Sequence, residues 1–124
     1  IELCGLHDYA SFCRPKPKAT TIREVRSIEI RRKVADGNVI EIEIVADAFC
    51  HNMVRSIVGA LIAAGEGKAS PSDIAATLAR KTRVGSYKVQ PAHGLTLVGV
   101  GYPSNDKLAA QAELARNLRS LDEN

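Results

Sequence analysis

The spacing of hydrophobic residues changes once along this chain, from every second residue to every fourth, and that change most constrains the fold. In two stretches isoleucine alternates with polar residues, at positions 28 and 30 and again at 40, 42 and 44. Such alternation is typical of half-buried strands. Asp36-Gly37-Asn38, between the stretches, contains residues that tolerate positive φ. The pattern therefore predicts a β-hairpin.

From residue 49 onward, apolar residues recur every four positions. One such row consists of Phe49, Met53, Ile57 and Leu61. This spacing predicts an amphipathic helix of about four turns. Asp47 is a candidate N-cap for it, and Gly65 stands where a glycine can end a helix.

Three further elements are predicted downstream. Ser70-Pro71-Ser72-Asp73 combines a capping hydroxyl, an early proline and an acid, and predicts a helix continuing to about residue 81. Residues 95–102 resemble a mostly buried strand, and residues 104–124 a surface helix or frayed tail. The whole order predicts an α+β fold, an antiparallel or mixed β-sheet with helices packed on one face.

Composition restricts the class of protein. The chain has 124 residues, of which 45% are hydrophobic and 25% charged, as expected for one globular domain. With only 4% aromatic residues, an RNA-stacking aromatic sheet is disfavoured. No apolar run reaches the roughly 20 residues that cross a bilayer, so no membrane is expected as a partner. Because the chain starts at Ile1, we expect a fragment of a longer protein.

The three cysteines indicate a compartment. Cys4, Cys13 and Cys50 form no C-x-x-C pair. Free thiols in a reducing cytosol, and thus a cytoplasmic protein, are the expectation.

Positive charge is concentrated near the N-terminal end. Eight basic residues and only two acids lie between Arg14 and Lys33. A run of one sign is often a solvated face, but it is also how proteins bind RNA phosphates. Both interpretations stay open.

Arg55 is the residue in the predicted helix that most needs a partner. It follows His51 by one turn, beside a wide apolar stripe. A guanidinium held near a core cannot lose its charge, and therefore requires an anion. That anion is either a structural carboxylate of this domain or a functional group, such as a catalytic carboxylate or a bound anion.

Four segments carry a resemblance to a known family: HDYASF at 7–12, FCHNMVRSIVG at 49–59, KTR at 81–83 and GLTLVGVGYP at 94–103. Together they resemble the C-terminal half of the tRNA pseudouridine synthase A (TruA) family. The helix segment is similar to that family's F-x-H-x-M-V-R-x-I-V-G, and the last segment to its G-L-x-L-x-x-V-x-Y-P.

The resemblance implies an isomerase that converts uridine to pseudouridine in the tRNA anticodon stem-loop. Such enzymes act as homodimers and use neither cofactor nor metal. Their catalytic aspartate lies in the N-terminal half, in a motif resembling R-x-D-x-G-V-H-A that this sequence lacks. The N-terminal half of the same enzyme is therefore an expected partner. Residues 1–103 are expected to form a catalytic-support domain, followed by a helix or tail at 104–124.

The resemblance also assigns roles to individual residues. Arg55 matches the arginine that orients the catalytic aspartate and keeps it ionised. Gly94 and Leu95 match the floor of the uridine pocket, and His51 and Asn52 are expected in its wall.

Charge and position add candidates for binding tRNA phosphates: Arg14, Lys16, Lys18 and Arg83. The alternative function is a non-catalytic RNA-binding or dimerisation module.

Overall fold

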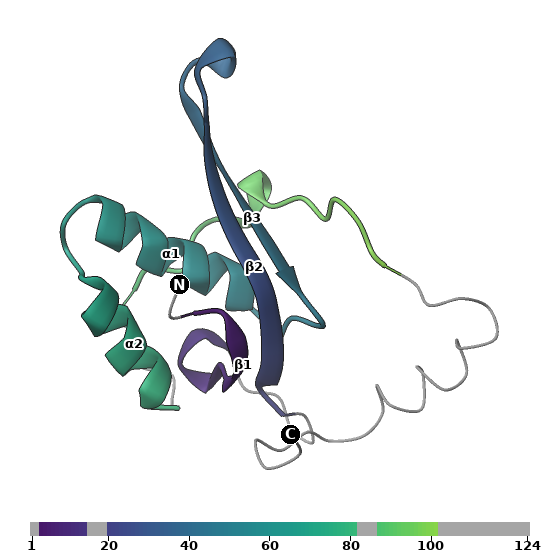
Figure 1. Ribbon diagram of the computed structural model, residues 1–124, viewed down its shortest axis with the longest axis vertical. Coiled ribbons are helices and arrows are strands. Elements are labelled where there is room, and N and C mark those ends of the chain that lie inside the picture. The colour runs from purple at the N-terminus through teal and green to yellow at the C-terminus, as the bar shows by residue number, and fades with distance from the viewer. Residues whose placement is uncertain (1–2, 15–19, 82–86, 102–124) are drawn as a thin grey trace.

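The structure is a computed structural model, which describes residues 3–14, 20–81 and 87–101 (Figure 1). Its elements are β1 (Gly5–Asp8), the 3₁₀ turn η1 (Ala10–Phe12), β2 (Ile22–Lys33), η2 (Val34–Asp36), β3 (Val39–Ala46), α1 (Met53–Gly65), α2 (Pro71–Ala79) and η3 (Ala92–Gly94). Both pairings of the sheet, in the order β1-β2-β3, are antiparallel. The α+β prediction is confirmed. None of the helices described has the length and apolar character needed to cross a membrane.

Strands β2 and β3 form the predicted hairpin. Ile28 pairs with Ile44, and Ile30 with Ile42, so the alternating isoleucines share one face. Gly37 and Asn38 adopt the positive φ values that the turn requires, 76° and 62°. The tip of the hairpin extends beyond the helices (Figure 1).

The opposite face of the hairpin carries a ladder of paired charges. Arg31 donates to Glu29 and Glu41, and Lys33 lies 3.0 Å from a carboxylate oxygen of Glu41. Hydrogen bonds to Glu29 and Glu41 raise the pKa of Arg31, and Lys33 lowers the pKa of Glu41. These two cations therefore have partners within the sheet. At this end of the basic run, the structure supports a solvated face.

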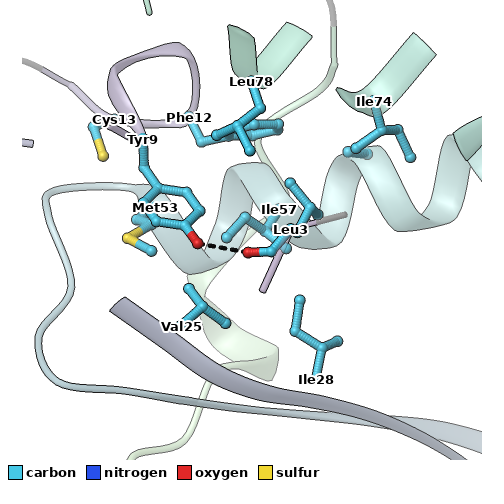
Figure 2. Packing of buried hydrophobic residues seen from close by; sticks show 11 residues of the cluster. Leu3, Tyr9, Phe12, Cys13, Val25, Ile28, Met53, Ile57, Ile74 and Leu78 are labelled. Atoms are coloured by element: carbon cyan, nitrogen blue, oxygen red, sulfur yellow. Dashed lines mark hydrogen bonds between the residues drawn. The ribbon is translucent and has the colours of Figure 1, made fainter. Parts of the chain in front are cut away.

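The core lies between the sheet and the helices (Figure 2). Strand β2 contributes Val25 and Ile28, which face Met53 and Ile57 of α1. Tyr9 is fully buried beside them. Its hydroxyl donates to the carbonyl oxygen of Leu3 at 2.5 Å. The apolar faces of the hairpin and the helix thus pack on each other around Val25 and Ile28, whereas Ile30 and Ile40, nearer the tip of the hairpin, are exposed.

The predicted start of the first long helix is wrong. Helix α1 begins at Met53, with Asn52 at its N-cap. The Asp47 carboxylate instead accepts hydrogen bonds from the backbone N–H groups of Glu24 and Ala48, at 2.9 and 2.8 Å. Asp47 therefore closes the end of the β2-β3 pair, a competing use of the same side-chain chemistry that favours N-caps.

The predicted strand at residues 95–102 is also not formed in its described part. Residues 95–101 have no regular secondary structure, and Leu97 and Val98 are 75% and 80% exposed. A strand requires a neighbouring strand to pair with, and within the described residues the sheet contains β1, β2 and β3 only. The predicted tail at 104–124 lies outside the described residues. Strand β1, which the sequence patterns did not predict, pairs with β2.

The expectation of three free thiols is correct only for Cys4. Cys13 and Cys50 are joined by a disulfide, with 5.7 Å between their Cα atoms. Their separation of 37 residues concealed this proximity. Spacing along a chain does not report distance in space once a hairpin has returned the chain on itself.

Helix α2 begins with the predicted capping box. The Ser70 hydroxyl accepts from Asp73 N, and the Asp73 carboxylate accepts from Ser70 N at 2.9 Å. Hydrogen bonds to the Asp73 carboxylate, from the Ser70 backbone first and the Ser70 side chain second, lower the pKa of Asp73 from its ordinary 3.8. The ionised carboxylate is therefore the form that the fold stabilises.

We expect Asp73→Ala to lower the stability of the protein at neutral pH. A carboxyl whose pKa is lowered in the folded protein stabilises the fold at pH values above the ordinary pKa of that carboxyl. This contribution disappears as the pH falls through the pKa of the carboxyl in the folded protein. In urea unfolding at a series of pH values, the midpoints of the wild type and the variant should therefore differ at pH 7 and converge below pH 3.8. A difference that does not change with pH would contradict this assignment.

Candidate functional site

The turn before α1 sets the position of the candidate residues. Asn52 occupies the left-handed region, with φ 65°. Asparagine is one of the few residues other than glycine that adopts it readily. After this reversal, Asn52 and Arg55 lie on the same face of the helix, three positions apart.

Arg55 is half-buried and held at two points. Its Nε donates to the backbone carbonyl of Gln90 at 2.6 Å. Its Nη1 donates to Oδ1 of Asn52 at 3.2 Å. The backbone N–H of Gln90 also donates to the Arg55 carbonyl, at 3.2 Å. The segment around residue 90 and the helix are therefore joined at Arg55 through both side chain and backbone.

The charge of Arg55 is not paired in the described part of the chain. Within residues 3–14, 20–81 and 87–101, no carboxylate oxygen lies within 4.0 Å of its guanidinium. An arginine side chain has five N–H groups, and the bonds to Gln90 and Asn52 use two of them. Both N–H groups on Nη2 remain for an anion. The described residues thus provide no structural ion pair for Arg55, one of the two possibilities that its spacing left open.

The loop after η1 lies beside the turn that precedes α1. The backbone N–H of Arg14 donates to the His51 carbonyl at 2.8 Å, next to the Cys13–Cys50 disulfide. The side chains of Arg14 and His51 are both exposed. The fold therefore brings one predicted phosphate-binding residue next to a predicted pocket residue. Three others, Lys16, Lys18 and Arg83, lie outside the described residues.

Gly94 and Leu95 lie on the segment that continues from Gln90. Both are exposed, Leu95 by 50%. The backbone N–H of Leu95 donates to the carbonyl of Ala92 at 3.0 Å and closes η3. The structure thus places this pair four and five residues after the Arg55 contact. A hollow of about 260 Å³ lies elsewhere, over α2 between Lys68 and Tyr87.

Two aspartates, Asp8 and Asp47, have structural roles. Asp8 accepts from the Thr21 hydroxyl at 2.5 Å and from Ala10 N at 3.0 Å. Asp47 holds the β2-β3 end described above. We assign neither carboxylate the role of a nucleophile. Among the residues that the structure describes, no three His, Cys, Asp or Glu side chains gather as a metal site requires.

Sequence patterns did not reveal the part played by Gln90. The atom that binds Arg55 is a backbone carbonyl, which every residue has, so the side chain at position 90 offers no signal. One indirect signal is Pro91, because the residue before a proline favours extended backbone. Extended backbone could have suggested a segment that presents its carbonyl to a neighbour, but not which neighbour.

Comparisons with known proteins agree with one another. The family model described as tRNA pseudouridine synthase matches residues 1–103. The chain is 47% identical to the tRNA pseudouridine synthase A of Leifsonia xyli and 48% identical to that of Frankia casuarinae, and covers 41% and 43% of their lengths. The corresponding protein of Mycobacterium leprae is 44% identical and covered over 41%. Each comparison includes 96% of this chain, which spans about two fifths of these relatives.

Proposed function

Since the chain belongs to the tRNA pseudouridine synthase family, we propose that the complete protein isomerises uridine to pseudouridine in the anticodon stem-loop of tRNA. This chain supplies Arg55 and one wall of the active site. The observation that carries the proposal is the Arg55 guanidinium, held at Nε and Nη1 with Nη2 left for an anion. The relatives named above are each called tRNA pseudouridine synthase A, which supports the reaction and the substrate class.

The partner of Arg55 in this proposal is the catalytic aspartate of the N-terminal half of the same enzyme. A guanidinium beside a carboxylate lowers the pKa of that carboxyl and fixes its direction through charge-assisted hydrogen bonds. The aspartate attacks the base or ribose of a flipped uridine, so that the uracil detaches, rotates and rejoins through carbon. Arg55 keeps the nucleophile ionised and aimed, and does not itself form a bond to the substrate.

The pocket residues follow from the same proposal. Gly94 and Leu95 form the floor beneath the uracil, and their exposure leaves them accessible to a base. His51 and Asn52 form part of the wall. Arg14 binds tRNA phosphate, as do three residues of the undescribed segments, Lys16, Lys18 and Arg83.

The organisation of the complete protein is also part of the proposal. Residues 1–103 form the catalytic-support domain and residues 104–124 an additional helix or tail, a division supported by the extent of the family match. The protein acts in the cytoplasm, as a homodimer, and without a cofactor.

A tritium-release assay with the complete protein tests this function. The substrate is an unmodified anticodon stem-loop carrying [5-³H]uridine. Rejoining through carbon 5 expels the hydrogen from that position, so we expect tritium release into water. Heat-inactivated protein provides the control.

Two outcomes would separate the proposal from its alternative. Binding of the stem-loop with a steep salt dependence, but without tritium release, would support a non-catalytic RNA-binding module. If the protein neither binds the stem-loop nor releases tritium, both the synthase and the RNA-binding module are excluded. At most a dimerisation or scaffold role would then be left.

A further inference from the structure

We propose that Gly59 and Asn52 are positioning residues for Arg55. Because Gly59 has no side chain, the segment from Lys88 to Gln90 can lie against the helix, and this segment binds Arg55. Asn52 binds the Arg55 guanidinium directly. The role of Arg55 toward a carboxylate rests on the proposed function, whereas the positioning itself rests on contacts within this chain.

The first step is the close approach at Gly59. This residue is buried in α1, and a Cβ built on it would lie 2.0 Å from the carbonyl oxygen of Lys88. No real Cβ contact is so short, and the atom that it would meet belongs to the backbone. Any larger residue at position 59 must therefore push the Lys88 backbone away from the helix.

The second step connects this approach to Arg55. Gln90 is two residues beyond Lys88, and its side-chain amide donates to the Lys88 carbonyl at 3.3 Å. The Gln90 carbonyl accepts from Arg55 Nε at 2.6 Å, and the Gln90 N–H donates to the Arg55 carbonyl. Lengthening the 2.0 Å approach at residue 88 to at least 3.0 Å requires a shift of about 1 Å or more. Such a shift would weaken or break the bonds that hold the guanidinium, because hydrogen bonds tolerate only a narrow range of distances and angles.

The third step is the geometry of the helix face. Asn52, Arg55 and Gly59 stand at positions i, i+3 and i+7, so all three lie on one side of α1. Asn52 holds Nη1 from the N-terminal side, and the Gln90 carbonyl holds Nε. With Nε occupied, an incoming carboxylate must bind the guanidinium through Nη2 and the remaining N–H of Nη1.

The test compares Gly59→Ala with Gly65→Ala in the complete protein. Both variants make the same change in the same helix, but Gly65 has open space around it. Exchange of the Arg55 Nε–H is measured by NMR, with the signal assigned by its loss in Arg55→Lys. We expect at least about tenfold faster exchange in Gly59→Ala, from the loss of one hydrogen bond, and unchanged exchange in Gly65→Ala. Unchanged exchange in Gly59→Ala would overturn the proposal.

A pH profile distinguishes positioning from a loss of folded protein. If Arg55 keeps a catalytic carboxyl ionised, releasing Arg55 raises the pKa of that carboxyl. The acid limb of kcat/KM should then move upward by roughly half a pH unit or more in Gly59→Ala. A merely unstable variant would lose activity equally at all pH values, which would contradict the proposal. If the wild type releases no tritium, the proposed function fails, but the exchange measurement still decides the positioning.

A second pair of variants covers the case in which Gly59→Ala does not fold. Asn52→Gly keeps the left-handed backbone and removes the Oδ1 acceptor. Asn38→Gly makes the same change at φ 62°, at the exposed hairpin tip. We expect the acid limb to move and the Arg55 Nη protons to exchange faster only in Asn52→Gly. Equal behaviour of the two variants would overturn the role of Asn52.

Discussion

If the proposed function holds, replacing Arg55 with alanine in the complete protein is expected to lower kcat by about 10²- to 10³-fold and to change KM for tRNA by less than about threefold. Gln90 and Asn52 bind the guanidinium at Nε and Nη1, which leaves Nη2 available for an anion. In the proposed function that anion is the catalytic carboxylate. Its ionised form is needed for the chemical step and not for binding tRNA. Single-turnover and steady-state tritium release measure the two effects separately.

The controls separate this role from general binding of phosphate. Arg55→Lys keeps the charge but loses the planar fork, so it cannot reach both the Gln90 carbonyl and a carboxylate, and kcat should fall by an intermediate factor. Arg26→Ala removes an exposed arginine that pairs with Glu24 on β2, and should leave kcat unchanged. Equal losses in kcat and in tRNA affinity for Arg55→Ala would indicate that Arg55 binds tRNA phosphates and does not orient a catalytic carboxylate.

The elements that could be predicted from the sequence are those with a local pattern, either apolar residues at a regular spacing or partners a few residues apart. The alternating isoleucines predict one face of a hairpin and the four-residue row predicts one face of a helix, and both elements were confirmed. Their buried parts meet in the core at Ile28 and Ile57, whereas Ile30, Ile40 and Phe49 are exposed. The capping box of α2 was confirmed because its partners are three residues apart.

The errors concern interactions between residues distant in the chain. Asp47 has the chemistry of an N-cap, but its carboxylate accepts a hydrogen bond from the backbone of Glu24, 23 residues away. Leu97 and Val98 have the composition of a strand, yet composition cannot supply a neighbouring strand. Cys13 and Cys50 meet only because the intervening residues fold back. Each error reflects the same cause, that a local pattern states what a residue can do and not what it meets.

The candidate site also contains one residue that the sequence could predict and contacts that it could not. Arg55 was singled out because a charge beside a buried apolar stripe requires a partner, and the resemblance implied which group that partner would be. Its actual contact, the Gln90 carbonyl, lies 35 residues away and belongs to the backbone. The close approach at Gly59 was equally hidden, because a glycine within a helix has no local signature of what packs on it.

Tyr9 offers the largest expected effect on stability. Its side chain is fully buried, and its hydroxyl donates to the carbonyls of Leu3 and Gly5 at 2.5 and 3.0 Å. Tyr9→Ala should lower the free energy of unfolding by about 3–5 kcal/mol, because the loss of a buried ring leaves a cavity that the core fills only in part. Tyr9→Phe should lower it by about 1–3 kcal/mol, because the buried Leu3 carbonyl and the partly buried Gly5 carbonyl lose their donor. Urea unfolding of the complete protein measures both.

A matched variant and a pH series test the cause. Tyr87→Phe removes a hydroxyl with one longer contact, 3.3 Å to the Thr77 hydroxyl, and should change stability by less than about 1 kcal/mol.

Burial first, and the nearby Cys4 second, raise the pKa of Tyr9 above its ordinary 10.0. The stabilisation is therefore complete below pH 10.0 and declines as pH rises above it, so the advantage of the wild type over Tyr9→Phe should shrink in that range. An advantage that is constant above pH 10.0 would mean that the Tyr9 hydroxyl ionises as readily in the folded protein as in the unfolded chain.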